Sequence, residues 1–318
     1  MAKRPAPPTP EGLTLDRILL RFSTDEAARE YLESVRWPDG PVCAHCGGKE
    51  KVYAIAANPE SKVRPGLYEC GECKAQFTVT VGTIFEDSKV PLRKWLVAWY
   101  LLCSSKKGFA AAQLQRALDL GSYRTAWFMC HRIRYALREP VFTDKLTGTV
   151  EADETWIGGR RRGLGRGYVE NKIPVVSLVE RSGRVRSAAL EKVTGRNLQA
   201  VLEEHVDCAA TLMTDENAGY TVAGRAFAAH HTVNHSEHEY ARGDAHINTA
   251  EGYFANLKRG IDGVYHHVGK QYLDQYLGEF DFRYNSRKDS DGKRTIDGLR
   301  RAAGKRLVLR RGTKGAGK

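Results

Sequence analysis

Four of the seven cysteines lie in two closely spaced pairs. Cys43 and Cys46 belong to "CAHC", and Cys70 and Cys73 belong to "CGEC", with 23 residues between the pairs. Two residues between cysteines allow both sulfurs to reach one tetrahedral ion, and two such turns make a closed structural Zn²⁺ site. The alternative, two redox dithiols, requires a βαβ pattern that this stretch lacks. We therefore predict a zinc ribbon with a hairpin between the two pairs.

Three acidic residues lie where carboxylates can bind divalent cations. Asp153 falls in the alternating stretch "TGTVEADETWIGG", Asp215 ends the strand-like run "ATLMTD", and Glu251 belongs to the helical pattern "INTAEGYFANLKRG". From Asp153 onward the patterns predict strand, strand, strand, helix, strand, helix or turn, strand, helix. This order resembles the ribonuclease H-like fold, in which the first and fourth strands are neighbours and a late helix reaches the same edge.

That resemblance implies that the three carboxylates meet. Carboxylates in close contact repel one another unless cations neutralise them, and oxygen ligands beside phosphate favour Mg²⁺ or Mn²⁺. Two such ions about 4 Å apart can activate a water or hydroxyl and stabilise the leaving oxygen. Strand alternation places Glu154 on the face opposite Asp153, so Glu154 is not chosen as a ligand, whereas Glu151 shares the face of Asp153 as a neighbour.

The chain also resembles DDE-type bacterial insertion-sequence transposases, specifically the group with an N-terminal zinc ribbon. The stretches "EADETWIGG", "TDENAGY" and "NTAEGYFANLKRGIDGVYHHV" are similar to the three catalytic blocks of that family. Thirty-five residues separate Asp215 from Glu251, and Lys258 follows Glu251 by seven, as in the family. "QFTVTVGTIFEDSKVPLRKW" and "FDFRYNSR" extend the resemblance over residues 20 to 290.

The resemblance implies roles for four residues. Asp153, Asp215 and Glu251 would hold two catalytic Mg²⁺ or Mn²⁺ ions, and Lys258 would contact a DNA phosphate. We expect Phe254 and Leu257 to pack this helix on the sheet, because they share a stripe between the two charged residues. The activity implied is cutting of element ends and joining of 3′ hydroxyls to target DNA, by a dimer or higher assembly on the terminal inverted repeats.

The charge of the chain favours a nucleic-acid partner. The formal net charge is +12 and the pI is near 9.4, which attracts a polyanion. An anionic membrane is less favoured, because no long basic amphipathic helix is present and the apolar stretch 95–103 is too short to span a bilayer. The first residues lack the apolar core of a signal peptide, and the cysteine usage suits a reducing compartment. We expect a cytoplasmic protein that joins the nucleoid when bound to DNA.

Two basic segments are candidate DNA contacts. A break at Gly121, with Ser122 as N-cap of the next helix, predicts a helix-turn-helix-like pair. The alternative is a packed helix pair with a solvated basic face. The exposed face of the second helix is expected to carry Arg124 and Arg132, together with His131, Arg134 and Arg138. Phosphate contacts are also expected from the glycine- and arginine-rich stretch 158–167, through Arg160, Arg161, Arg162 and Arg166. Lys258 and Arg259, which follow Leu257, are expected to make further contacts of this kind.

The sequence therefore predicts an α/β protein whose ribonuclease H-like mixed-sheet domain follows a zinc ribbon and a helical segment. The predicted parts are a disordered arm (1–20), a zinc ribbon with flanking helix (21–88), a helical DNA-binding segment (89–140), a DDE catalytic domain (141–286) and a basic tail (287–318). No phosphate-binding GxxxxGK[ST] loop occurs, so ATP use is not expected. The alternatives to a transposase are a noncatalytic transposase-derived DNA-binding regulator and a metal-dependent nuclease without strand transfer.

Overall fold

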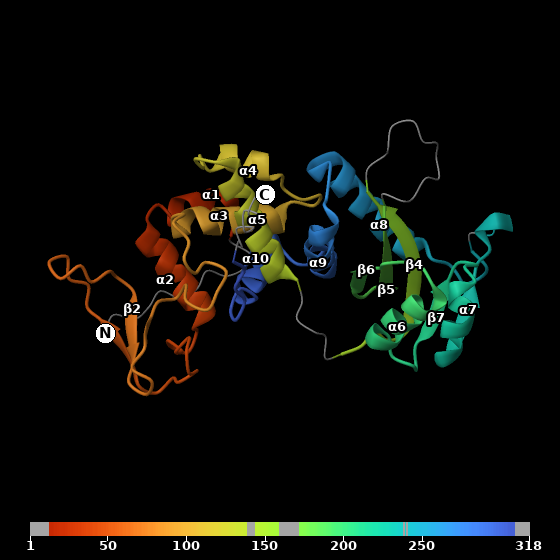
Figure 1. Ribbon diagram of the computed structural model, residues 1–318, viewed down its shortest axis with the longest axis horizontal. Helices are drawn as coiled ribbons and strands as arrows, with labels where there is room; N and C mark the ends of the chain where they lie inside the picture. Colours follow the sequence, from red (N-terminus) through yellow and green to blue (C-terminus); the bar gives the residue numbers. More distant parts are fainter. Residues whose placement is uncertain (1–12, 139–143, 159–171, 238, 240, 309–318) are drawn as a thin grey trace, which may run out of the picture. The chain divides into compact units, whose positions relative to one another are not determined.

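The computed structural model describes residues 13–138, 144–158, 172–237, 239 and 241–308. The chain forms two compact units (Figure 1). The first comprises Met1–Ser105, Ala111–Leu137 and Asp289–Lys318, and the second comprises Lys106–Ala110 and Arg138–Lys288. The site-bearing sheet belongs to the second unit.

The helices of the first unit are α1 (Leu15–Arg21), α2 (Asp25–Arg36), α3 (Leu92–Ser104), α4 (Ala111–Ala117), α5 (Tyr123–Leu137) and α10 (Asp291–Arg300). Helix α3 packs against α1, α2, α5 and α10, and α4 packs against α5. The buried indoles of Trp95 and Trp99 on α3 both contact Phe85. Threonine hydroxyls at Thr14 and Thr24 accept backbone N–H groups at the starts of α1 and α2, which satisfies donors that a helix end leaves free.

A small antiparallel sheet completes the first unit. Its order is β1 (Val52–Ile55), β2 (Leu67–Cys70) and β3 (Gln76–Phe77), so the predicted hairpin lies between the two cysteine pairs. The alternation at 77–81 predicts a longer strand than β3, but this prediction is wrong beyond Phe77. The Arg36 guanidinium donates to the carbonyls of Val79 and Val81, and turns follow, so this backbone has no ladder partner.

Three expectations for the first unit are corrected. The disordered arm expected at 1–20 overlaps α1, and the basic tail expected at 287–318 contains α10, which has Ser290 as its N-cap and packs on α3. On α5, His131, Arg132 and Arg134 are buried rather than exposed. The reason is that the C-terminal segment returns over this face, where Arg132 donates to the carbonyl of Leu307.

The second unit is built on a five-stranded mixed sheet. Its strands are β4 (Thr149–Ile157), β5 (Ile173–Glu180), β6 (Val185–Ala189), β7 (Thr211–Thr214) and β8 (Ala229–Thr232), in the order β6-β5-β4-β7-β8. β4, β5 and β6 pair antiparallel, whereas β4, β7 and β8 pair parallel. The predicted order of elements is confirmed, including the neighbouring first and fourth strands.

Helices cover both faces of the sheet. The helices are α6 (Gly195–His205), α7 (Gly219–Ala223), α8 (Asn248–Gly260) and α9 (Leu273–Asn285), with short 3₁₀ turns at η2 (Gly224–Ala226), η3 (His235–Glu237) and η5 (Lys270–Tyr272) and a π-helical turn at η4 (Ile261–Tyr265). On β5, Val175 packs with α8 and α9, whereas Val176 packs with α6 and α7. Period-two alternation thus divides the apolar residues between two cores.

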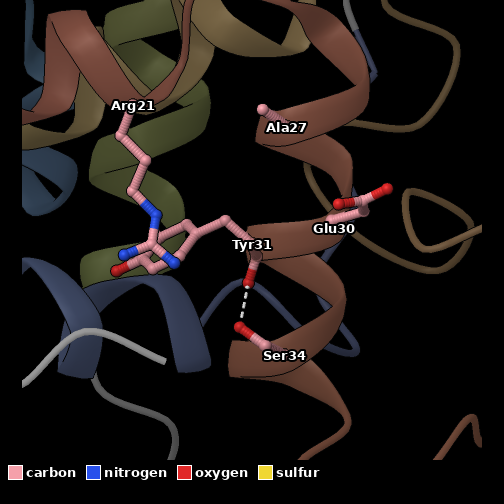
Figure 2. A pocket seen from close by; sticks show the side chains of 5 residues that line it. All are labelled: Arg21, Ala27, Glu30, Tyr31 and Ser34. Carbon is pink, nitrogen blue, oxygen red and sulfur yellow. Dashed lines mark hydrogen bonds between the residues drawn. The ribbon is translucent and has the colours of Figure 1, made fainter. Parts of the chain in front are cut away.

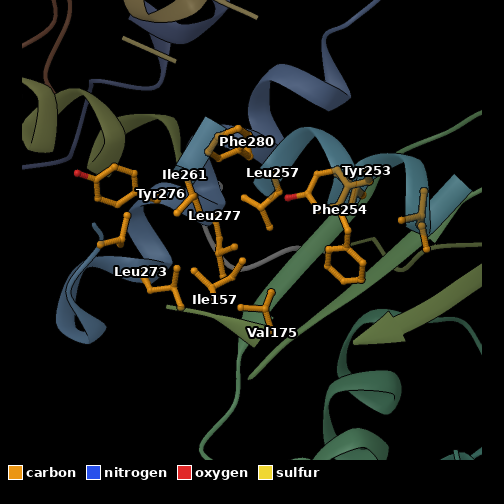
Figure 3. Packing of buried hydrophobic residues seen from close by; sticks show 14 residues of the cluster. Ile157, Val175, Tyr253, Phe254, Leu257, Ile261, Leu273, Tyr276, Leu277 and Phe280 are labelled. Carbon is orange, nitrogen blue, oxygen red and sulfur yellow. The ribbon is translucent and has the colours of Figure 1, made fainter. Parts of the chain in front are cut away.

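The core between the sheet and α8 seats the helix that carries Glu251. Phe254 and Leu257 are buried there against Ile157 and Val175, as Figure 3 shows, which confirms their predicted packing. Tyr276 and Phe280 of α9 lie in the same cluster. The orientation of α8 is therefore fixed by apolar burial along one stripe.

The first unit also holds a cavity of about 150 Å³ between α1 and α2 (Figure 2). Its lining residues are Arg21, Ala27, Glu30, Tyr31 and Ser34. The Arg21 guanidinium lies over the Tyr31 ring, and burial raises the pKa of Tyr31 to about 12. With one carboxylate, this cavity offers no group of acids for a cation.

Among the described residues, no helix is long and apolar enough to cross a membrane.

Candidate active site

The parallel pairing of β4 with β7 brings two predicted acids together. Glu151 is in register with Met213, so Asp153 and Asp215, each two residues farther along, reach the same end of the sheet. Carboxylate oxygens of Asp153, Glu154 and Asp215 all lie within 4.8 Å of one another. The structure therefore joins Asp153 to Asp215, and adds a third carboxylate that the sequence analysis set aside.

Glu154 reaches the group from the opposite face of β4. Its Oε1 accepts from Asn217 Nδ2 at 2.6 Å and its Oε2 from the Tyr220 hydroxyl at 2.6 Å. Alternation predicts the face on which its Cβ lies, but not how far a long side chain reaches from that face. The stretch "TDENAGY" holds both donors, so their spacing after Asp215 is the signal that could have suggested this contact.

Glu251 lies beside the three-carboxylate group. Its side chain on α8 is 47% exposed, and its charge is close enough to raise the pKa of Asp153. Nδ1 of His235 lies 3.8 Å from Glu251 Oε1. Glu251 thus lies near Asp153, but it is not one of the three residues whose carboxylate oxygens lie within 4.8 Å of one another.

The site brings several acidic side chains close together. Burial, followed by the charges of Asp215, Glu154 and Glu251, raises the pKa of Asp153 to about 7, although the backbone N–H of Glu154 opposes this rise. Burial also raises the pKa values of Glu154 and Asp215. Groups so perturbed are typical of functional sites. An all-oxygen donor set that holds excess negative charge fits Mg²⁺ or Mn²⁺.

The loop after β8 is attached next to Asp215. The Glu216 carboxylate accepts from the backbone N–H groups of His235 and Ser236 at 2.9 and 3.1 Å, and from the Ser236 hydroxyl at 2.6 Å. His235 is thereby held close to both Glu251 and Asp215. Its charge lowers the pKa of Asp215, against the rise that burial causes. His235 is a site neighbour to which the sequence analysis gave no role.

Glu151 connects the strand of Asp153 to the helix of Glu251. Its fully buried carboxylate accepts from the backbone N–H groups of Thr249 and Ala250 at 2.7 and 3.0 Å. Arg181 Nε donates to it at 2.8 Å, and Nδ1 of His246 lies 3.2 Å away. Glu151 is therefore the N-terminal cap of α8, supplied by β4, rather than a member of the acidic group.

The four cysteines meet as predicted. Sγ of Cys43 lies 3.6 Å from Sγ of Cys73, and Sγ of Cys46 lies 3.6 Å from Sγ of Cys70. A tetrahedron with Zn–S bonds of about 2.3 Å has edges of about 3.8 Å. All four are free thiols grouped within 4.8 Å, so they fit a structural Zn²⁺ ion.

The predicted DNA contacts fall into three groups. Lys258 and Arg259 are exposed in the last turn of α8, and Arg124 is exposed in the first turn of α5. The Ser122 hydroxyl accepts from the backbone N–H of Thr125, which confirms Ser122 as the N-cap of α5. Arg132 is buried. The remaining four arginines, Arg160, Arg161, Arg162 and Arg166, lie outside the described residues.

A ribonuclease H-like mixed sheet with clustered acids, in a chain that also carries a four-cysteine ribbon, defines a DDE-type transposase. The family of ISXO2-like transposase domains matches residues 145–285, and that of transposase zinc-ribbon domains matches residues 23–76. The chain is also 30% identical over 286 residues to a protein in transposable element ISH50 of Halobacterium salinarum, covering 82% of this chain and 91% of the relative. The chain therefore belongs to the zinc-ribbon transposase family with an ISXO2-like transposase domain.

Among solved structures, similarity extends to a chain of the simian T-cell lymphotropic virus intasome in complex with PP2A regulatory subunit B56 gamma, determined by cryo-electron microscopy. The match is 15% identical and covers 53% of this chain and 63% of that chain, less than two thirds of its length. The TM-score of this match is 0.28, which is too low to indicate a shared fold.

Proposed function

We propose that the protein is the transposase of an insertion sequence, which cuts the element ends and joins their 3′ hydroxyls to target DNA. The observation that carries this proposal is the meeting of Asp153, Glu154 and Asp215 at one end of the sheet, with Glu251 beside them. Two Mg²⁺ or Mn²⁺ ions would supply Lewis-acid chemistry there, activating the attacking hydroxyl and stabilising the leaving oxygen. Asp153, Asp215 and Glu251 are the residues proposed to hold them.

The residues of the chain have distinct tasks in this proposal. Because the pKa of Asp153 is about 7, this carboxyl is partly protonated near neutral pH, and a bound cation would displace the proton. Asn217 and Tyr220 hold the Glu154 carboxylate beside Asp215. Lys258 and Arg259 are proposed to neutralise backbone phosphates, and the zinc ribbon and helical segment to bind the element ends. Exchange of one phosphodiester for another requires no ATP, and a dimer or higher assembly is proposed to hold the paired ends.

A strand-transfer assay tests the proposal directly. Purified protein is incubated with Mg²⁺, a target plasmid and a labelled duplex carrying the inverted repeat that flanks the gene. Joined products are the expected result, and Asp153→Asn is expected to abolish them while DNA binding persists. Cleavage without joining would instead identify a nuclease, and a mobility shift without chemistry would identify a DNA-binding regulator.

A further inference from the structure

The segment Lys106–Ala110 is anchored to the unit that carries the acids, although it lies in sequence between α3 and α4 of the other unit. Phe109 is buried, and its backbone N–H donates to the Tyr265 hydroxyl at 3.2 Å. Gly108 has a φ of 103°, and a Cβ at this position would lie 1.9 Å from the Tyr265 hydroxyl oxygen. Position 108 therefore requires glycine for two reasons: its backbone conformation, and the close approach of the Tyr265 hydroxyl.

A second anchor places this segment against the end of α8. A Cβ at Gly260 would lie 2.7 Å from the carbonyl oxygen of Lys107, so the Lys107 peptide rests directly on Gly260. The Tyr265 hydroxyl also donates to the buried Glu279 at 2.7 Å, which fixes the tyrosine that holds the segment. Two stretches of chain far apart in sequence therefore touch immediately beyond Arg259.

Four cationic residues adjoin this contact in sequence, and all four are exposed: Lys106, Lys107, Lys258 and Arg259. Within the described part of the chain, none of them forms an ion pair or a hydrogen bond with a carboxylate. Arg181 of the same unit, by contrast, pairs with Glu151. Asp262 is the one acidic residue in the stretch 252–266, so the surface retains a net positive charge.

We propose that Lys106, Lys107, Lys258 and Arg259 form one surface that binds the phosphate backbone of duplex DNA. The charges are uncompensated, two of them stand on a rigidly anchored segment, and lysine contacts of this kind position DNA without reading its sequence. Lys258 lies seven residues after Glu251 on α8, about 10 Å along the helix axis. At 3.4 Å per nucleotide of one strand, the surface would contact phosphates about three nucleotides from the linkage being cut.

This proposal rests on the proposed function for its substrate, and Lys106 and Lys107 provide the test. Binding of a labelled duplex is measured by fluorescence anisotropy between 50 and 300 mM KCl, in Asp153→Asn protein so that the DNA is not cut. Lys106→Ala/Lys107→Ala is expected to reduce the slope of log K against log salt by about one per lysine. Affinity near 100 mM salt should fall about tenfold per lysine, equally for specific and random duplexes.

Two further proteins make the result decisive. Lys192→Ala/Lys288→Ala removes two exposed lysines of the same unit and should leave the slope close to that of the parent. Lys106→Arg/Lys107→Arg keeps the charge and should retain the parent slope, which separates charge from folding. If the Asp153→Asn parent binds DNA but Lys106→Ala/Lys107→Ala and Lys192→Ala/Lys288→Ala have equal salt slopes, the proposed surface alone is overturned. A parent that does not bind DNA overturns the proposed function as well.

Discussion

The Glu151 carboxylate accepts two hydrogen bonds from Thr249, one from its backbone N–H at 2.7 Å and one from its hydroxyl at 2.9 Å. Glu151 lies two residues before Asp153 on β4, and Thr249 lies two residues before Glu251 on α8. The buried Glu151 charge thus fixes the start of α8, which carries Glu251, against β4, which carries Asp153. The helix dipole also favours a negative charge at the start of α8.

Glu151→Gln should therefore weaken metal binding without removing a proposed ligand. The substitution leaves the Arg181 guanidinium without its partner charge and loosens the start of α8, so the free energy of unfolding should fall by about 2 to 4 kcal/mol. Mn²⁺ affinity, measured by calorimetry, should fall severalfold. If Glu151 acts through Glu251, its effect on affinity should largely vanish in Glu251→Gln protein, because the two residues would not be independent.

A matched control exists for Glu151→Gln. Glu279 is also a fully buried glutamate of the same unit, paired with Arg283. Glu279→Gln should cost comparable stability but leave Mn²⁺ affinity unchanged. Equal losses of affinity in the two variants would show that lost stability, not the placement of α8, explains the effect.

Zinc should be present at one ion per chain, and Cys43→Ser should release it. The ribbon has only short strands, so we expect its fold to depend on the metal. Zinc content by atomic absorption and the change in circular dichroism on chelation measure both effects. Cys208→Ser is the control, because Cys208 is an exposed cysteine outside the four-cysteine group. Full zinc content in Cys43→Ser would contradict the assignment of that ligand.

The raised pKa of Asp153 predicts opposite pH trends for metal-free stability and metal affinity. An unfolded aspartate titrates near 4, whereas burial and neighbouring acids raise the pKa of Asp153 to about 7. Between these values the folded protein holds a proton that the unfolded chain has lost. The contribution of Asp153 to the metal-free unfolding free energy therefore falls as pH rises through this window, by at most about 1.4 kcal/mol per unit.

Metal affinity should change in the other direction, because a cation competes with that proton. Below pH 7 the Mn²⁺ dissociation constant should rise about tenfold for each unit of pH decrease. Urea unfolding of metal-free wild type and Asp153→Asn from pH 5 to 8, with calorimetric Mn²⁺ titrations of the wild type, measures the two trends. A difference in stability between the two proteins that does not vary with pH would rule out this titration.

The limits of sequence reasoning are visible at individual residues. The meeting of Asp153 with Asp215 could be predicted, because the resemblance to the ribonuclease H-like fold makes the first and fourth strands neighbours. In the structure each acid lies two residues beyond the paired residues Glu151 and Met213. The four cysteines could be predicted from spacing alone. The burial of Arg132 could not, because it depends on the distant carbonyl of Leu307. The early end of β3 likewise depends on Arg36, which lies 43 residues before Val79.

Glu154 is the case in which side-chain reach decides the outcome, and Tyr220→Phe tests its importance. The Tyr220 hydroxyl lowers the pKa of Glu154 against the rise caused by burial, and a hydrogen bond to a charged group contributes about 1.5 to 3 kcal/mol. Without it, the Glu154 carboxylate should bind protons more readily. The acid limb of Mn²⁺ affinity should then move about one to two pH units higher.

Tyr253→Phe is the control for this shift, because Tyr253 is also buried in the second unit, where its hydroxyl donates to Asp281 instead. Its Mn²⁺ profile from pH 5.5 to 8.5 should match that of the wild type. If Tyr220→Phe also matches the wild type, Glu154 does not titrate with the metal site. Its place within 4.8 Å of Asp153 and Asp215 would then reflect its hydrogen bonds to Asn217 and Tyr220, and the ions would be left to Asp153, Asp215 and Glu251.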